Sequence, residues 1–425
     1  MTVLRAWRLA AGWLAPLAVG AGSARADPGG LISRETVAAS ADVRVIAADG
    51  ERSWLDGGFG KARWSGGSNG ALRVRPELTE ATVAWLPRLG WAVSGTIVAI
   101  AQNGQQHGVD LSEAFLTFRA RPAGAVRATA RLGLFWPPVS LEHGGTEWRV
   151  NDTITPSAIG SWIGEEVKLT GAEFNLALPA GNGRIALTAA AFGMNDTSGT
   201  LLAFRGWALH DEKAVAFGKQ PLPPFNGFIA NIQPRYTRPV IGISGYVGFY
   251  GKLAWTPAAP IRIEAFHYDN RANPQDVNAS KEWGWRTRFD TVGAVARIGR
   301  VTLRAQGMDG RTVMGFSMAG PGGVGRWVNT RFRSAYLMAT RETDWGSLSG
   351  RIEAFGTRNH GSQLTAVDDE DGWAATFAGR RQIGDHFALL AEFQHIDSDK
   401  DARLRVRIDP TQAQNVAQVA LRAHL

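Results

Sequence analysis

Apolar and polar residues alternate through most of this chain, in runs of about ten residues that are separated by turns. In the segment 125–136, apolar residues at the even positions alternate with Arg127, Thr129 and Arg131. A period of two places the two sets on opposite faces of a β-strand. The pattern therefore predicts an all-β protein whose strands are apolar on one face and polar on the other.

The connections between these runs alternate between short and long. Short turns are predicted at 121–124, 179–183, 257–260, 298–300 and 382–385. Long connections are predicted at 137–165, 195–245, 270–282, 310–329, 358–371 and 398–413. Short turns at one end and long loops at the other are typical of outer-membrane β-barrels, with the long loops extracellular.

With this constraint the chain divides into rising and falling strands of one antiparallel transmembrane barrel of about 16 strands. Rising strands are predicted at 53–64, 89–101, 125–135, 183–193, 261–269, 300–309, 346–357 and 386–397. Falling strands are predicted at 72–86, 110–119, 166–178, 246–256, 283–297, 330–341, 371–381 and 414–425. The segment 42–47 also has a strand pattern but is not used in this division. It is either an N-terminal periplasmic piece or part of an 18-stranded barrel, which is the alternative.

The beginning of the chain has the pattern of a secretory signal peptide. Arg5 and Arg8 precede a short apolar run, and Ala24-Arg25-Ala26 is a small-x-small cleavage site. We therefore expect residues 1–26 to be removed and residues 27–425 to form the barrel. After residue 26 no apolar run approaches the roughly 18 residues of a membrane-spanning helix, so membrane residence requires a closed barrel, and we expect an outer-membrane location.

Composition excludes one class of partner and fits the export of the chain. The formal net charge is +8, but the arginines are spread along alternating segments without a basic cluster, so nucleic-acid binding is not expected. The chain has no cysteine and 16 tryptophans. Trp near strand ends is typical of the aromatic girdles of membrane barrels.

Six segments resemble a proteobacterial porin family related to the phosphate-selective porins O and P. They are SWLDGGFGKARW (53–64), LGLFWPPVSLE (132–142), TPSAIGSWIGEE (155–166), LLAFRGWALHD (201–211), HYDNRANP (267–274) and FRSAYLMA (332–339). The resemblance implies a passive diffusion channel for small hydrophilic solutes, commonly a homotrimer, with a loop folded into the pore.

The end of the chain is similar to the terminal strand signal that the barrel assembly machinery reads. Leu421, Ala423 and Leu425 continue the apolar alternation to the last residue. The family norm is a terminal aromatic residue, from which Leu425 departs.

The polar face of the predicted strands faces water inside the barrel, where charges select ions by sign. The alternation places arginines there, a residue type suited to carboxylate and phosphate, and so predicts a preference for small anionic or polar solutes. Pairing with wall acids is the competing role for these arginines. The predicted pore-lining residues are Arg73, Arg75, Arg127, Arg131, Arg184, Arg262, Arg300, Arg304 and Arg351, and the alternation adds Arg286, Arg288 and Asp290.

The segment 137–165 is the predicted constriction loop, with a short helix near 151–162 that begins at Thr155 or Ser157. Its lining residues are predicted to be Glu142, His143, Glu147, Arg149, Asp152 and Glu165. The segment 195–245 is predicted to be a long extracellular or inward-folded loop. It is too long for a bare loop in a compact fold, and 201–210 is a candidate helix within it.

Two other functions remain as alternatives. One is a substrate-specific 18-stranded channel for small carboxylates. The other, less favoured, is a barrel enzyme, which needs a nucleophile beside a positioned base; His143-Gly144-Gly145-Thr146 is the nearest such arrangement. We expect no catalytic residue, metal or cofactor, and we expect contact with outer-membrane lipid and lipopolysaccharide.

Overall fold

The computed structural model describes residues 31–33, 35–321, 323–363 and 368–424. The predicted signal peptide and Leu425 therefore lie outside the described residues.

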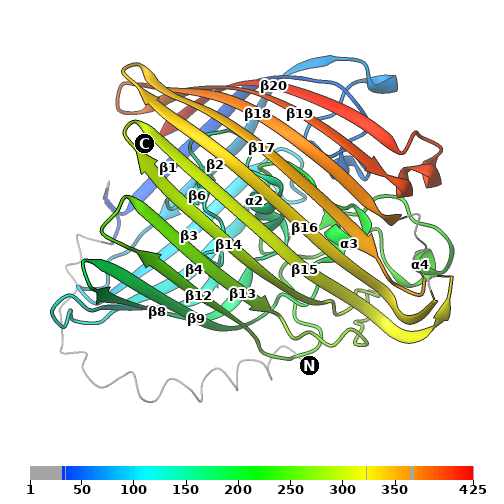
Figure 1. The fold of residues 1–425 in the computed structure, drawn as a ribbon, viewed down its shortest axis with the longest axis horizontal. Helices are drawn as coiled ribbons and strands as arrows, with labels where there is room; N and C mark the ends of the chain where they lie inside the picture. Colours follow the sequence, from blue (N-terminus) through cyan, green and yellow to red (C-terminus); the bar gives the residue numbers. More distant parts are fainter. Residues whose placement is uncertain (1–30, 34, 322, 364–367, 425) are drawn as a thin grey trace.

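In the part of the chain that the structure describes, sixteen antiparallel strands close into one barrel, and each strand pairs with its neighbours in chain order (Figure 1). The first strand pairs with the last, so the sheet has no free edge. This confirms the predicted barrel and strand number, and the 18-stranded alternative is wrong. The strands are β1 (Val37–Ala48), β2 (Arg73–Trp85), β3 (Val93–Gln102), β4 (Asp110–Arg119), β5 (Arg127–Phe135), β8 (Leu169–Ala180), β9 (Gly183–Gly193), β12 (Gly248–Thr256), β13 (Ile261–Asp269), β14 (Arg286–Ile298), β15 (Val301–Gly320), β16 (Gly323–Thr343), β17 (Gly346–Asn359), β18 (Glu370–Ile383), β19 (Phe387–Lys400) and β20 (Thr411–His424).

The first strand of the barrel is not the predicted one. The segment 42–47, which the prediction left over, belongs to β1, whereas 53–64 contains the 3-10 helix η3 (Trp54–Asp56) and folds into the barrel. Ser53 caps η3 by accepting a hydrogen bond from the Leu55 amide, and Gly57 ends it with a φ of 75°. This cap and turn replace the extended backbone that the alternation indicated.

Two predicted loops are partly strand. The segment 310–329 was predicted as a loop, but β15 and β16 continue through it and form the longest hairpin of the barrel, drawn in yellow in Figure 1. The segment 398–413 is shorter as a loop than predicted, because β19 continues to Lys400, η6 spans Asp401–Val406 and β20 starts at Thr411.

The helices lie in the long connections. In the described part of the chain they are α2 (Ala158–Glu165), α3 (Thr200–Phe204) and α4 (Gly227–Ile232). The same connections contain the two-residue strands β6 (His143–Gly144), β7 (Arg149–Val150), β10 (Gln220–Pro221) and β11 (Tyr236–Thr237), and the connection between β1 and β2 contains η4 (Ser68–Gly70). The helix predicted at 151–162 thus lies a few residues further along, and that predicted at 201–210 is reduced to one turn. Among the described residues, no helix has the length and apolar character needed to cross a membrane.

The outer face of the barrel is apolar over several residues of each strand. On neighbouring strands β17 and β18, Ile352 and Phe377 are 61% and 62% exposed, while the inward side chains between them are buried. A closed sheet with this outward surface satisfies its backbone internally and presents hydrocarbon to lipid.

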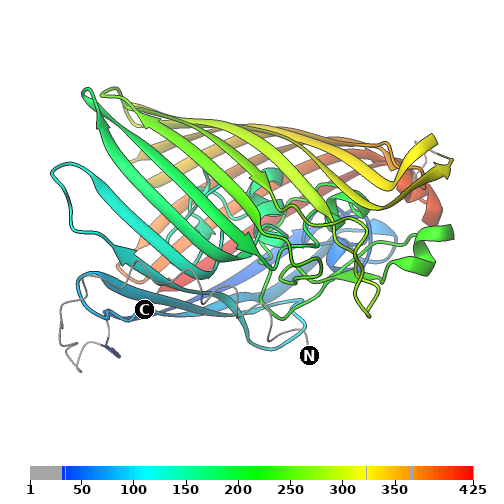
Figure 2. The ribbon, with the colours of Figure 1, turned by 90° about the horizontal axis from the view of Figure 1, so that it is seen from below.

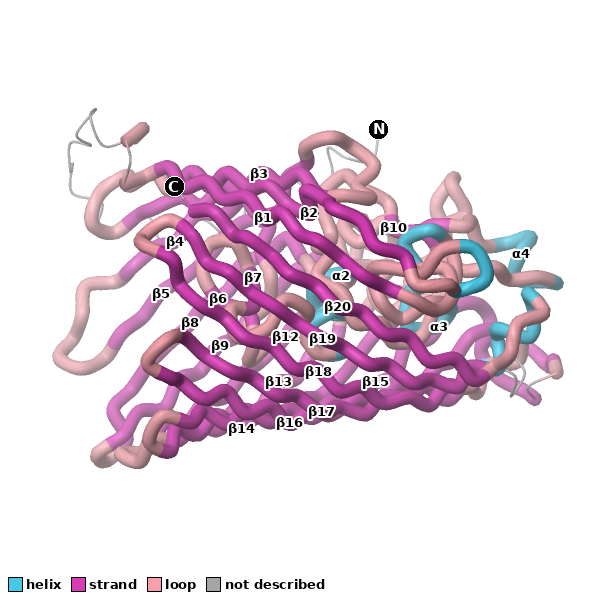
Figure 3. The backbone as a smooth tube through the Cα atoms, turned by 90° about the horizontal axis from the view of Figure 1, so that it is seen from above, coloured by secondary structure: helices cyan, strands magenta, loops and turns pink. Residues whose placement is uncertain are grey.

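Connecting segments fill much of the interior. α2 and α3 lie inside the barrel wall (Figures 2 and 3). The Trp162 ring of α2 packs on the inward rings of Phe289 and Phe332, with centroids 5.0 Å apart in each pair. These rings belong to an apolar core inside the barrel. The polar face of the strands was expected to meet water, but in the middle of the barrel the inward side chains meet this core.

Candidate functional site

The connection between β5 and β8 contains the predicted constriction loop and is bound to the far wall by carboxylates. Glu353 of β17 accepts a hydrogen bond from the Ala158 amide at 2.6 Å, and Glu392 of β19 accepts from the Ile154 amide at 2.6 Å and from the Thr155 amide. Ser157 caps α2 by accepting from the Gly160 amide at 3.1 Å. Acids at the N-terminus of a helix are favoured by its unpaired amides and dipole, so the wall fixes the start of α2.

Arg351 lies at the centre of this attachment and has no exposed surface. Its guanidinium forms ion pairs with Glu353 at 2.8 Å and with Glu142 of the loop at 3.0 Å. It also donates to the backbone oxygens of Thr155 and Pro156, each at 3.0 Å. Arg351 and Glu142 therefore join the loop to the wall and do not line open space.

Ion pairs attach the loop to other parts of the wall as well. Arg149 pairs with Glu80 of β2 at 2.5 Å and with Glu147 at 2.7 Å. Asp152 pairs with Arg304 of β15 at 2.6 Å, and both side chains remain about one-fifth exposed. The loop is thus bonded to strands on both sides of the barrel.

The connection between β9 and β12 packs on the first loop and is also held by buried ions. Glu165 pairs with Arg205 and His210, and all three side chains are fully buried. The neighbouring Glu166 accepts from the Gly199 and Leu201 amides at 2.8 and 2.7 Å. Burial raises the pKa of Glu166 to about 7, against the lowering effect of its hydrogen bonds.

His143 of the loop has a serine neighbour. Its Nδ1 lies 2.8 Å from Ser140 Oγ, which also accepts from the amides of Glu142 and His143. The serine oxygen is thus the acceptor of a local turn. Burial lowers the pKa of His143 to about 3, which keeps its imidazole neutral.

The predicted wall arginines divide into two groups. Five of them pair with carboxylates. Arg131 pairs with Glu173 at 2.7 Å and Arg262 with Glu264 at 2.6 Å, and both acids are in strands; Arg300 pairs with Asp344, a turn residue, at 2.6 Å. Arg304 and Arg351 pair with acids of the loop and wall as described above. Arg73 and Arg75 lie at the long-loop end, where Arg75 donates to the Ser65 oxygen at 2.9 Å.

Arg127 and Arg184 face inward at the short-turn end and are exposed. Arg127 donates to the backbone oxygens of Gly124 and Val126 and not to a carboxylate. The prediction missed Arg119 and Arg297, which the strand alternation places inward at the same end and which are also exposed. Strict alternation along β4 and β14 would have placed both arginines on the inward face, opposite the outward apolar residues that flank them.

The prediction also placed three residues on the wrong face. Arg286, Arg288 and Asp290 point outward, because Thr287, Phe289 and Thr291 between them are buried inside the barrel. In the half of β14 near the long loops, the Phe289 ring faces the internal core and the three charged side chains face outward.

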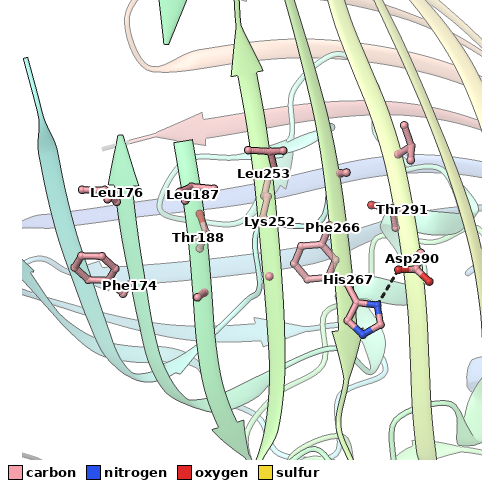
Figure 4. A pocket seen from close by; sticks show the side chains of 14 residues that line it. Phe174, Leu176, Leu187, Thr188, Lys252, Leu253, Phe266, His267, Asp290 and Thr291 are labelled. Atoms are coloured by element: carbon pink, nitrogen blue, oxygen red, sulfur yellow. Dashed lines mark hydrogen bonds and ion pairs between the residues drawn. The ribbon is translucent and has the colours of Figure 1, made fainter. Parts of the chain in front are cut away.

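The outer wall has a hollow of about 660 Å³ over β8, β9, β12, β13 and β14 (Figure 4). Phe174, Leu187 and Leu253 form its apolar lining, and Gly251 lies between them. At its polar end His267 Nδ1 lies 2.8 Å from Asp290 Oδ1.

No protein-family model matches the chain, and no curated protein sequence matches it. Solved structures with the same fold include an anion-selective porin from Comamonas acidovorans, with 11% identity over 92% of this chain and 99% of that one and a TM-score of 0.51. The outer-membrane channel DcaP of Acinetobacter baumannii has 11% identity over 93% and 99% of the two chains and a TM-score of 0.55. OprB of Pseudomonas putida has 10% identity over 92% and 94% and a TM-score of 0.50.

These likenesses show the fold of outer-membrane porin barrels, and with the apolar outer wall they identify the chain as an outer-membrane β-barrel protein. The narrower resemblance to the phosphate-selective porins O and P stays a prediction, because no family model matches.

Proposed function

We propose that this barrel is a passive diffusion channel for small hydrophilic solutes, with a preference for anions. The observation that carries the proposal is the group of exposed inward arginines at the short-turn end, Arg119, Arg127, Arg184 and Arg297. Exposed guanidinium groups at a channel mouth attract anions and repel cations. The anion-selective porin with the same fold supports the class of function.

The loop 137–165 is the proposed constriction. Arg351, Glu353 and Glu392 hold it across the barrel. Among the charged side chains of the loop, Asp152 and Glu147 remain partly exposed, as does Arg304, the wall partner of Asp152. Because three connections fold into the barrel, those after β1, β5 and β9, we expect a narrow bore and a small conductance.

The alternatives are less well supported. The channel for small carboxylates was tied to 18 strands, which the barrel does not have, although arginines at its mouth suit carboxylates. For an enzyme, the Ser140–His143 contact lacks the character of an activated nucleophile, because Ser140 Oγ already accepts two amide hydrogen bonds.

Partners follow from the same proposal. Assembly as a homotrimer and recognition of the last strand by the barrel assembly machinery remain our proposals. In β20, Leu421 faces outward and is 44% exposed, and Ala423 shares its face.

The test is the reversal potential of the purified protein in planar bilayers under a salt gradient. We expect anion selectivity that weakens as salt rises, because charges are screened within roughly 10 Å at 0.1 M. Replacing Arg127→Glu and Arg184→Glu together lowers or reverses the preference. Arg381→Glu is the matched control, since Arg381 is exposed at the same end but faces outward, and it leaves selectivity unchanged. A cation-selective native channel contradicts the anion preference.

A further inference from the structure

Four arginines stand in direct register on the outer face of four adjacent strands. Arg288 of β14 is opposite Arg311 of β15, Arg311 is opposite Arg331 of β16, and Arg331 is opposite Arg358 of β17. Like charges directly opposite in a sheet destabilise it. Negative charge from outside the chain would therefore stabilise a row of four.

The aspartates nearby neutralise only part of this arginine row, since Arg358 pairs with Asp371 and Asp369 while Arg331 shares Asp309 with Arg333. Asp309 accepts from both Arg331 at 3.0 Å and Arg333 at 2.7 Å. Arg358 pairs with Asp371 at 2.8 Å, whereas Arg311 donates to the amide oxygen of Asn329 at 2.5 Å. The paired guanidinium groups of Arg331 and Arg333 stay 48% and 62% exposed, so they retain donors for a further anion.

The row lies at the edge of the apolar band. At the next outward position of each strand, two residues closer to the short turns, the outer face has Asp290, Asp309 and Arg333. The position after that is apolar or small, with Val292, Gly307, Ala335 and Ala354 in successive strands. The row is on the side of the long loops, so in the membrane it is at the level where lipid hydrocarbon ends and headgroups begin.

The polar end of the apolar hollow adjoins the arginine row at β14. Asp290, which lines the hollow, is two residues from Arg288 on the same face of β14. Gly251 leaves the floor open, because a Cβ built there meets no atom within 4 Å. The hollow of about 660 Å³ has the apolar lining and the length across five strands that suit an acyl chain.

We propose that the outer face of β14–β17 binds a phosphorylated glycolipid of the outer leaflet, with its phosphates on the arginine row and an acyl chain in the hollow. Guanidinium groups donate paired hydrogen bonds to phosphate oxygens, and the chain adds apolar contact that free phosphate cannot supply. The proposal depends on the outer-membrane location and not on the solute of the channel.

The first experiment measures binding of diphosphoryl lipid A to the full barrel in zwitterionic detergent by native mass spectrometry. The triple variant Arg288→Gln, Arg311→Gln, Arg331→Gln should weaken binding by at least about tenfold, since charge-assisted hydrogen bonds are lost. The control pair Arg341→Gln and Arg381→Gln, on the outer face at the opposite end of the barrel, should leave binding unchanged. Heat-dependent migration in gels verifies that each variant is folded.

The second experiment separates the lipid from other occupants. Dephosphorylated lipid A should bind more weakly than the diphosphoryl form, and millimolar inorganic phosphate should not displace the lipid. Gly251→Leu should weaken lipid binding without changing the oligomeric state. Equal binding by the triple variant, full displacement by inorganic phosphate, or a change of oligomeric state in place of lipid loss would each overturn the proposal. None of these outcomes bears on the reversal potential that tests the channel.

Discussion

Arg351 connects the wall to the constriction loop through groups that are themselves buried, Glu142 and Glu353. Burying two carboxylates is unfavourable unless their charge and hydrogen bonds are compensated. Loss of the guanidinium therefore destabilises the attachment by more than the loss of one exposed pair.

We predict that Arg351→Met lowers the free energy of unfolding by about 3–5 kcal/mol, the usual result of breaking a buried ion pair from one side. Urea unfolding in detergent, followed by tryptophan fluorescence, measures the change. Arg127→Gln, at an exposed inward position, should shift stability by only about 0.5 kcal/mol. Equal stability of Arg351→Met and the native chain would mean that the loop is not held in this way.

Residue parity predicted which wall arginines face inward for most positions, but not which are wet. Arg131 has the predicted direction, yet it is bonded to Glu173 through two nitrogen atoms at 2.7 and 2.8 Å. A glutamate at that position would face Glu173, so Arg131 is unsuitable for a charge-reversal test of selectivity. Whether an inward residue is wet depends on loops that are distant in sequence, and alternation does not report them.

At the scale of elements, alternation identified the membrane strands well, because one face of each meets lipid. Fifteen of the predicted strands correspond to barrel strands, and β1 is the segment that the prediction left over. The segment 53–64 alternates without being a strand, because its apolar residues, among them Trp54 and Phe59, are buried inside the barrel. In β14 the same core reversed the polarity of the two faces.

The apolar outer face of β17 gives a test of whether the barrel lies in a membrane. Ile352 lies in the middle of the outward row of β17, between Gly350 and Ala354. We predict that Ile352→Arg costs about 2–4 kcal/mol, the value for arginine near the bilayer midplane, in equilibrium unfolding from lipid vesicles. Thr302→Arg, at a partly exposed inward position near the short-turn end, is the control and should be tolerated. Similar losses for both would mean that the outer face does not meet lipid.

Over the whole molecule, the two proposals use arginines on opposite faces and at opposite ends of the barrel. The inward arginines of the proposed channel mouth, among them Arg127 and Arg184, lie at the short-turn end, whereas the outward arginine row, with Arg288 and Arg331, lies at the long-loop end. The glycolipid proposal therefore depends on the orientation of the barrel in the membrane. Anions attracted to the mouth and phosphates bound on the wall would meet the protein from opposite sides of the membrane.

This orientation is testable because the chain has no cysteine, so a single introduced thiol is the only target of a maleimide. Ser280 is exposed in the long connection between β13 and β14, and Ala259 is exposed in the short turn between β12 and β13. A bulky polyethylene-glycol maleimide cannot pass a narrow channel. We expect it to label Ser280→Cys on intact cells, because long loops of outer-membrane barrels are extracellular. Ala259→Cys should react only after the outer membrane is permeabilised. The reverse pattern would place the arginine row in the inner leaflet, away from the phosphorylated glycolipid, and would contradict that proposal while leaving the barrel itself unchanged.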